Sequence, residues 1–186
     1  MHVIVIGAGI IGASAAYYLT RSGASVTVID AQPDPGGVAT PASFSWINAS
    51  HGNPRHYFEL RMHAIDGWRR LETRFPNGTI NLCGGVWAEL EGRELEDGVR
   101  MLAQWGYDIR LVDRLELARL EPGLAHPPAM AAIASDEGMV ESERFAAMLL
   151  SAASPHLLYG TEVLAVETGN GRCRGVRTTA GSMAAD

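Results

Sequence analysis

Three glycines near the start of the chain and one aspartate have the types and spacing needed to bind an adenine dinucleotide. Gly7, Gly9 and Gly12 form a GxGxxG pattern directly after the apolar run of residues 3–6. Gly7 permits a tight turn, Gly9 lets the backbone approach a pyrophosphate, and Gly12 lets a following helix pack closely on a sheet. Asp30 ends the next apolar run, where its carboxylate accepts hydrogen bonds from a ribose and repels a 2′-phosphate.

The elements that position these residues are a strand, a helix and a second strand. Residues 3–6 suit a short buried parallel strand, residues 13–22 form the helix, and Gly23 ends it as a C-cap. The N-terminus of the helix offers unpaired N–H groups and the positive end of its dipole to phosphates. This pattern predicts a βαβ opening of the Rossmann type, and the fingerprint alone does not separate FAD from NAD.

Composition narrows the class of protein. The chain has 186 residues and a net charge of −6, and no basic cluster runs along it, so nucleic acid is not an expected partner. No apolar run reaches the roughly 20 residues that span a bilayer, so no transmembrane segment is expected. The histidines are scattered without metal-ligand spacing, which predicts no metal site. A cytoplasmic protein is the default expectation.

The order of the remaining elements indicates a second region inside the nucleotide-binding domain. Residues 33–53 are rich in Pro, Gly, Ser and Ala, and a loop this long in a compact domain is usually functional or disordered. Asp113 and Glu116 have the form of a capping box, Ser142 is expected to cap a helix, and Asn170-Gly171 favours a hairpin turn. Periodicity predicts helices over residues 54–75, 94–105 and 142–153, and strands over residues 79–90, 129–135, 138–141, 156–159, 161–168 and 173–178.

Several motifs in matching order resemble the FAD-dependent amino acid oxidase and dehydrogenase family, which includes glycine oxidase, sarcosine oxidase and D-amino acid dehydrogenase. The resemblance covers essentially the whole chain. It begins with the fingerprint and continues through the loop that follows Asp30. The matching segments are residues 7–30, 36–49, Gly84-Gly85, Leu120-Glu-Pro, 136–142 and 160–163.

The resemblance implies an α/β fold with FAD as the cofactor. Residues 1–80 and 138–186 would form an incomplete Rossmann-like FAD-binding domain, interrupted by residues 81–137 as a partial α+β substrate or cap region. Residues near the glycine turn would meet the pyrophosphate, Asp30 the ribose, the following loop the phosphates and isoalloxazine, and Val163 the adenine. The implied cofactor-binding residues are Gly7, Ala8, Gly9, Ile10, Ile11, Gly12, Asp30, Ala31, Gln32, Gly37, Ala39, Thr40, Ser43, Phe44, Ser45, Trp46 and Val163.

The implied activity is oxidation of an amine or amino acid by hydride transfer from the α carbon to flavin N5. No catalytic residue stands out, and the family's mechanism needs none from this part of the chain. Family members are roughly twice as long, so the chain resembles their N-terminal half and is expected to be a truncated product, a fragment or a chain completed by a partner.

Two other functions compete with this one. The first is a FAD- or nucleotide-binding fragment that has no turnover by itself. The second is an NAD-binding dehydrogenase domain, although the loop of residues 36–49 replaces the short βα unit that usually follows the acid in such domains. Half a sheet leaves open edges and exposed apolar surface, which predicts self-association, a partner chain or marginal stability.

Overall fold

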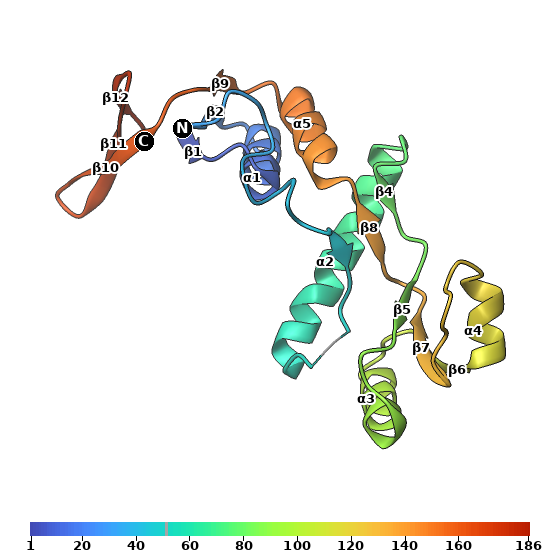
Figure 1. The fold of residues 1–186 in the computed structure, drawn as a ribbon. Helices are drawn as coiled ribbons and strands as arrows, with labels where there is room; N and C mark the ends of the chain where they lie inside the picture. The colour runs from blue at the N-terminus through green and yellow to red at the C-terminus, as the bar shows by residue number, and fades with distance from the viewer. Residues whose placement is uncertain (51) are drawn as a thin grey trace. The chain divides into compact units, whose positions relative to one another are not determined.

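The computed structural model describes residues 1–50 and 52–186 and folds them into two compact units (Figure 1). Unit 1 combines residues 1–44 with residues 141–186, and unit 2 consists of residues 45–140. The expected domain boundaries differ from these, because residues 45–80 fold with unit 2. The division into a FAD-binding and a substrate domain stays a prediction.

A parallel sheet opens unit 1 as the sequence predicts. It consists of β1 (His2–Ile6), β2 (Ser25–Ile29) and β9 (His156–Leu158), in the order β1-β2-β9. α1 (Ile10–Arg21) crosses from β1 to β2, and both strands run parallel with Val5 opposite Val28. The βαβ opening and the α/β class are therefore confirmed. The helix starts three residues earlier than expected, directly after Gly9.

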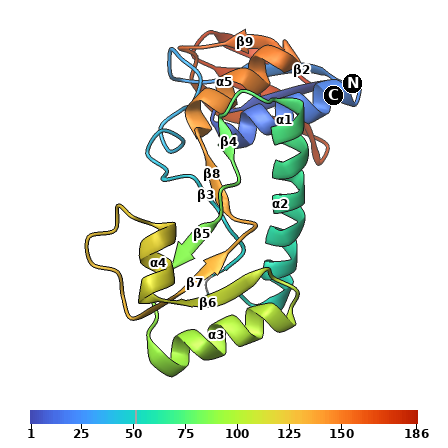
Figure 2. The same ribbon diagram turned by 90° about the vertical axis from the view of Figure 1, so that its right-hand side faces the viewer.

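Small side chains let two helices of unit 1 pack closely. Figures 1 and 2 show α1 beside α5 (Ser142–Ala153), and residues of the two helices are in contact. Ala13, Ala16 and Ala146 are fully buried. Gly23 follows α1 with a φ of +86°, which agrees with its predicted role as the C-terminal stop.

The C-terminal part of unit 1 is an antiparallel meander. Its strands are β10 (Val163–Gly169), β11 (Arg172–Thr178) and β12 (Gly181–Ala184). Asn170 and Gly171 both have positive φ, +54° and +74°, as a tight hairpin turn requires.

The described residues of unit 2 form the helices α2 (Arg55–Arg74), α3 (Gly92–Gln104) and α4 (Arg114–Leu120). α2 and α3 lie within about two residues of the helices that periodicity predicts, and α4 follows the capping box. The capping box is confirmed, because the Asp113 carboxylate accepts a hydrogen bond of 2.8 Å from the Glu116 N–H.

The described strands of unit 2 form two small antiparallel sheets. The first has the order β3-β8-β4 and the second β5-β7-β6, and Figure 2 shows α3 and α4 beside the second one. Val112 and Leu117 are buried between that sheet and α4. The strands are β3 (Trp46–Ile47), β4 (Ile80–Asn81), β5 (Gly85–Trp87), β6 (Ile109–Asp113), β7 (Met130–Ala134) and β8 (Gly138–Val140).

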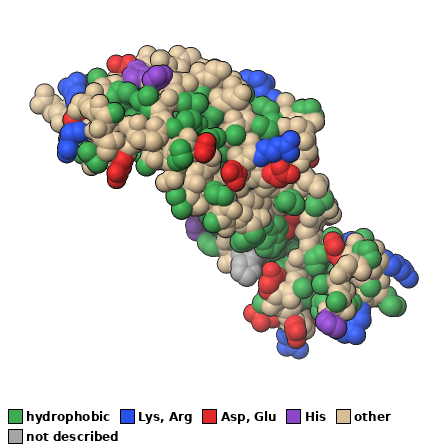
Figure 3. Space-filling view, turned by 45° about the horizontal axis from the view of Figure 1, so that its top comes forward, with side chains coloured by type: hydrophobic (Ala, Val, Ile, Leu, Met, Phe, Trp, Pro, Cys, Tyr) green, Lys and Arg blue, Asp and Glu red, His purple; other side chains and the backbone are tan. Residues whose placement is uncertain are grey.

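Charged side chains of both signs are interspersed over the face drawn in Figure 3. Several ion pairs join residues three or four positions apart on one helix, such as Arg55–Glu59 and Arg100–Asp97. Such exposed pairs stabilise a protein by roughly 0.3–0.5 kcal/mol each. Among the described residues, none of the helices combines the length and apolar character that crossing a membrane requires.

Candidate dinucleotide site

The glycine turn between β1 and α1 is shaped by backbone constraints at two positions. Gly7 has a φ of +102°, a conformation that favours glycine, and its N–H donates to the Ile29 carbonyl oxygen at 2.8 Å. A Cβ at Gly12 would overlap the carbonyl oxygen of Gly7. The two residues therefore fix the turn against β2 and bring the first turn of α1 close to it.

The N-terminus of α1 faces the loop that follows β2. Gly9 occupies the N-cap position without a side-chain cap, and the Thr40 hydroxyl oxygen accepts a hydrogen bond of 3.0 Å from the Ile10 N–H. A Cβ at Gly9 would lie 3.0 Å from that hydroxyl oxygen and 3.4 Å from the Gly36 carbonyl oxygen. Glycine at this position thus lets the loop approach the helix N-terminus.

Asp30 joins the glycine turn to the start of the loop. Its side chain is 9% exposed, and one carboxylate oxygen accepts from the Ala8 N–H at 2.6 Å. The other oxygen accepts from the Gln32 N–H at 2.7 Å. Burial raises the pKa of the nearby Tyr159, and the negative charges of Asp30 and Asp34 raise it further.

A cavity of about 550 Å³ lies over the glycine turn in unit 1. It is lined by most of the residues that the sequence singles out: Gly7, Gly9, Ile10, Ile11, Gly12, Asp30, Ala31, Gln32, Gly37, Ala39 and Thr40. Its lining combines an open helix N-terminus, a buried carboxylate and a hydroxyl. These groups fit the pyrophosphate and ribose of a dinucleotide.

The other predicted residues lie outside this lining. Ala8 is fully buried behind the turn, and Phe44 is 84% exposed. Ser43 also belongs to unit 1, as does Val163 at the start of β10, opposite Thr178. Ser45 and Trp46 belong to unit 2. The structure thus brings together the residues predicted to bind the phosphates and the ribose. Their roles, like the assignments to isoalloxazine and adenine, stay predictions.

Five residues of the cavity lining were not among the predicted ones: Val5, Ile6, Ala15, Gly36 and Val38. Gly36 lines the cavity, and a Cβ there would meet the Glu143 side chain at 2.9 Å. Its place in a Gly-Gly pair was a usable signal. Ser142 does not cap α5 as expected, because its hydroxyl instead donates to the Thr40 carbonyl oxygen at 3.0 Å. That contact spans 102 positions and leaves no signal in the local sequence.

The parallel βαβ opening, the glycine turn and the carboxylate at the end of β2 define a dinucleotide-binding protein of the Rossmann class. The model of one family, described as FAD dependent oxidoreductase, matches residues 2–186. The chain belongs to this family of FAD-dependent oxidoreductases. Membership confirms the resemblance and the expected cofactor class, FAD.

Individual relatives agree with this assignment. A D-amino acid dehydrogenase of Methylobacterium radiotolerans is 28% identical over 136 residues, which are 68% of this chain and 31% of the relative. An L-proline dehydrogenase structure from P. horikoshii has a TM-score of 0.86 at 20% identity. The match covers 97% of this chain and 50% of the L-proline dehydrogenase chain. A glycine oxidase structure from Geobacillus kaustophilus has a TM-score of 0.83 at 23% identity. The match covers 98% of this chain and 52% of the glycine oxidase chain.

These structural likenesses, all below 25% identity, establish the fold. The chain spans about half the length of the two structures and a third of the dehydrogenase. Within the described part of the chain, no group of three or more His, Cys, Asp and Glu residues is placed to hold a metal ion.

Proposed function

We propose that this chain forms the FAD-binding part of an oxidoreductase that acts on an amine or an amino acid. The observation that carries the proposal is the cavity over the glycine turn, with the α1 N-terminus on one side and Asp30 on another. Membership of the FAD-dependent family supports FAD over NAD as the occupant.

Each group around the cavity has a role in this proposal. The N–H groups at the start of α1 and the Thr40 hydroxyl bind the pyrophosphate. Asp30 is held in place by the Ala8 and Gln32 amides, and its remaining lone pairs accept from the ribose hydroxyls. When bound, the flavin supplies the electron acceptor for oxidation of the substrate's carbon–nitrogen bond.

The segments assigned from the family resemblance complete the cofactor site in this proposal. The stretch from Ser43 to Trp46 adjoins the isoalloxazine, and Val163 adjoins the adenine. The substrate is a small amine or amino acid, which is supported by relatives named D-amino acid dehydrogenase, glycine oxidase and L-proline dehydrogenase. The proposal assigns no catalytic residue to this chain.

A visible spectrum of the purified chain with and without added FAD tests cofactor binding. Flavin absorbance that survives gel filtration supports the proposal, and a chain that binds no added FAD contradicts it. Asp30→Asn removes a charged hydrogen-bond acceptor worth about 1.5–3 kcal/mol, so we expect FAD affinity to fall roughly 10- to 100-fold. Asp34→Asn, at an exposed position of the same loop, is the matched control and leaves the affinity unchanged.

A second candidate function is FAD binding without turnover. It is favoured by the length of the chain relative to the two solved structures, of which it covers 50% and 52%. Turnover of glycine, proline, sarcosine or D-amino acids by the FAD-loaded chain favours the first function. Bound FAD without turnover of any of them favours the second.

We also propose a cytoplasmic location. Cys83 and Cys173 are both free, which agrees with a reducing compartment. Cell fractionation tests this location, and recovery of the protein from an oxidising compartment contradicts it.

A further inference from the structure

Unit 2 contains a fully buried carboxylate that the proposed function has not yet used. Glu137, in the turn between β7 and β8, has a relative exposure of 0%. One carboxylate oxygen accepts from the Tyr107 hydroxyl at 2.5 Å and the other from the Trp46 indole N–H at 2.8 Å. Tyr107 in turn accepts from the Ala49 N–H at 3.0 Å. The side chain thus connects both ends of the segment 46–49.

The backbone around Glu137 leaves it no room to move. Its carbonyl oxygen accepts from the Gly84 N–H at 2.8 Å, and a Cβ at Gly85 would collide with the Glu137 carboxylate. A Cβ at Gly138 would overlap the Asn81 carbonyl oxygen. Glycine at position 85 therefore makes space for the carboxylate, and glycine at position 138 lets the backbone next to Glu137 approach the backbone of Asn81.

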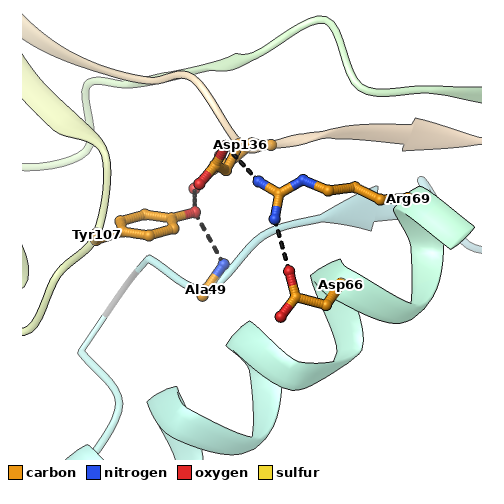
Figure 4. A network of polar contacts seen from close by, with 6 residues as sticks. Ala49, Asp66, Arg69, Tyr107 and Asp136 are labelled. Atoms are coloured by element: carbon orange, nitrogen blue, oxygen red, sulfur yellow. Dashed lines mark hydrogen bonds and ion pairs between the residues drawn. The ribbon is translucent and has the colours of Figure 1, made fainter.

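The residue before Glu137 ties the same turn to α2. Figure 4 shows Asp136 facing Arg69, which also pairs with Asp66, while Tyr107 points toward Ala49. The Arg69–Asp66 pair has an N···O distance of 2.7 Å. The turn is thus held by α2 through Asp136 and by the interior through Glu137, so the position of the buried carboxylate is well defined.

Burying a carboxylate away from water lowers the stability of a fold. Burial raises the pKa of Glu137, and the hydrogen bonds from Tyr107, Ser50 and Trp46 offset this only in part. Buried charges often contribute little net stability compared with apolar residues of similar volume. A carboxylate has one property that glutamine lacks, because both of its oxygens accept hydrogen bonds. That property is needed where a hydroxyl and an indole N–H converge from two sides.

We propose that Glu137 is a positioning residue that fixes the Trp46 indole and the Ala49 backbone, and through them the segment next to the flavin. This inference rests on the proposed function, in which the stretch from Ser43 to Trp46 adjoins the isoalloxazine. Glu137 acts through its two partners and does not itself touch the cofactor. Replacement by glutamine removes the negative charge, which weakens the hydrogen bond from the Trp46 indole N–H even where the amide oxygen still faces it.

The first test follows the Trp46 indole N–H by NMR in the chain without FAD, with the signal assigned through Trp46→Phe. We expect Glu137→Gln to move this signal upfield and to speed its exchange with solvent at least tenfold. Glu89→Gln, whose side chain bonds only locally to the Ala88 N–H, is the matched control and leaves the signal unchanged. An unchanged Trp46 signal in Glu137→Gln overturns the proposal.

The second test measures FAD affinity in the same variants. We expect Glu137→Gln to bind FAD at least fivefold more weakly than the wild type and Glu89→Gln. In a Trp46→Phe background the Glu137 substitution is expected to cause a smaller further loss, because both changes act on one contact. Wild-type affinity in Glu137→Gln overturns the proposal.

The two tests separate this inference from the proposed function. If the wild type binds no FAD, the proposed function fails, and the role of Glu137 next to the flavin fails with it, whatever the indole signal shows. If the wild type binds FAD and the Trp46 indole signal is the same in the wild type and in Glu137→Gln, only the positioning role fails. Should Glu137→Gln not fold, Tyr107→Phe removes only the hydroxyl between Glu137 and Ala49, and the same loss of affinity is expected.

Discussion

An added Cβ meets different atoms at Gly9 and at Gly12, so we expect two different defects. Gly12→Ala forces the Gly7 carbonyl away and is expected to destabilise the chain by about 3 kcal/mol. Gly9→Ala meets only the Thr40 hydroxyl oxygen at 3.0 Å and the Gly36 carbonyl oxygen at 3.4 Å. We expect it to fold with nearly normal stability and to bind FAD at least tenfold more weakly, because its methyl group enters the cavity.

Thermal unfolding and FAD titration of both variants check this prediction. Gly67→Ala is the matched control, since it lies within α2, where the nearest atom to an added Cβ is the Arg70 Nη2 at 3.8 Å. Alanine in a helix interior is more stable than glycine by roughly 0.5–1 kcal/mol. Equal stability of Gly12→Ala and Gly9→Ala would contradict the structure of the turn.

At the scale of elements, a hydrogen bond connects α5 to the loop over the cavity. Ser142 at the start of the helix donates to the carbonyl oxygen of Thr40. The hydroxyl of Thr40 in turn accepts from the Ile10 N–H at the N-terminus of α1. Ser142→Ala removes a bond worth about 1 kcal/mol, so we expect a roughly fivefold loss of FAD affinity. FAD titration measures it, with the exposed Ser151→Ala of the same helix as control. Equal affinities in the two variants would show that α5 does not support the loop.

Local patterns were sufficient to predict many of the elements. The apolar stripe of α3, the capping box of α4 and the turn at Asn170-Gly171 each depend on neighbours a few positions apart. The glycine turn and Asp30 were equally predictable, because their geometry belongs to one βαβ unit. Seven of the predicted residues around the cavity could be assigned only through the family resemblance: Ile10, Ile11, Ala31, Gln32, Gly37, Ala39 and Thr40.

Contacts between distant segments were not predictable from the sequence. Asp136-Glu-Gly has the composition of an exposed turn, yet Glu137 is buried because Trp46 and Tyr107 reach it from 91 and 30 positions away. Ser142 has the composition of a helix cap, and its partner is again remote. The helical pattern of α2 likewise does not reveal which sheet the helix accompanies.

For the whole molecule, the buried carboxylate predicts a dependence of stability on pH. The pKa of Glu137 is raised above its ordinary value of 4.5, so between the unfolded-state and folded-state pKa values the folded protein still holds a proton that the unfolded chain has released. The stability contributed by this proton is fully present below pH 4.5 and is lost as the pH rises through the folded-state pKa. Asp136, paired with Arg69, and Tyr107 are the neighbouring titratable groups.

Melting temperatures of the wild type and Glu137→Gln between pH 4 and 8 check this prediction. We expect the wild type to lose stability relative to the variant as the pH increases. Glu89→Gln is the control, and we expect its melting temperature to differ from that of the wild type by the same amount at every pH. A wild type that gains stability relative to Glu137→Gln over this range would contradict the direction of the pKa shift.

The open edge of the parallel sheet predicts association. Among the described strands, β1 pairs only with β2, and Ile6, Leu164 and Val166 are 53%, 50% and 54% exposed. Sheet edges and apolar surface of this kind promote pairing with another chain. We expect sedimentation velocity to show self-association at micromolar concentration, or a low melting temperature. A monomer that melts cooperatively at high temperature would contradict this expectation.

The strand entering unit 2 pairs with the strand leaving it. The Val140 N–H donates to the Ser45 carbonyl oxygen at 3.2 Å, and in unit 1 Ser142 donates to the Thr40 carbonyl oxygen at 3.0 Å. The 96 residues of unit 2 therefore form one continuous insertion between the two chain segments of unit 1. Such an insertion can be shortened, enlarged or exchanged during evolution while the glycine turn stays intact.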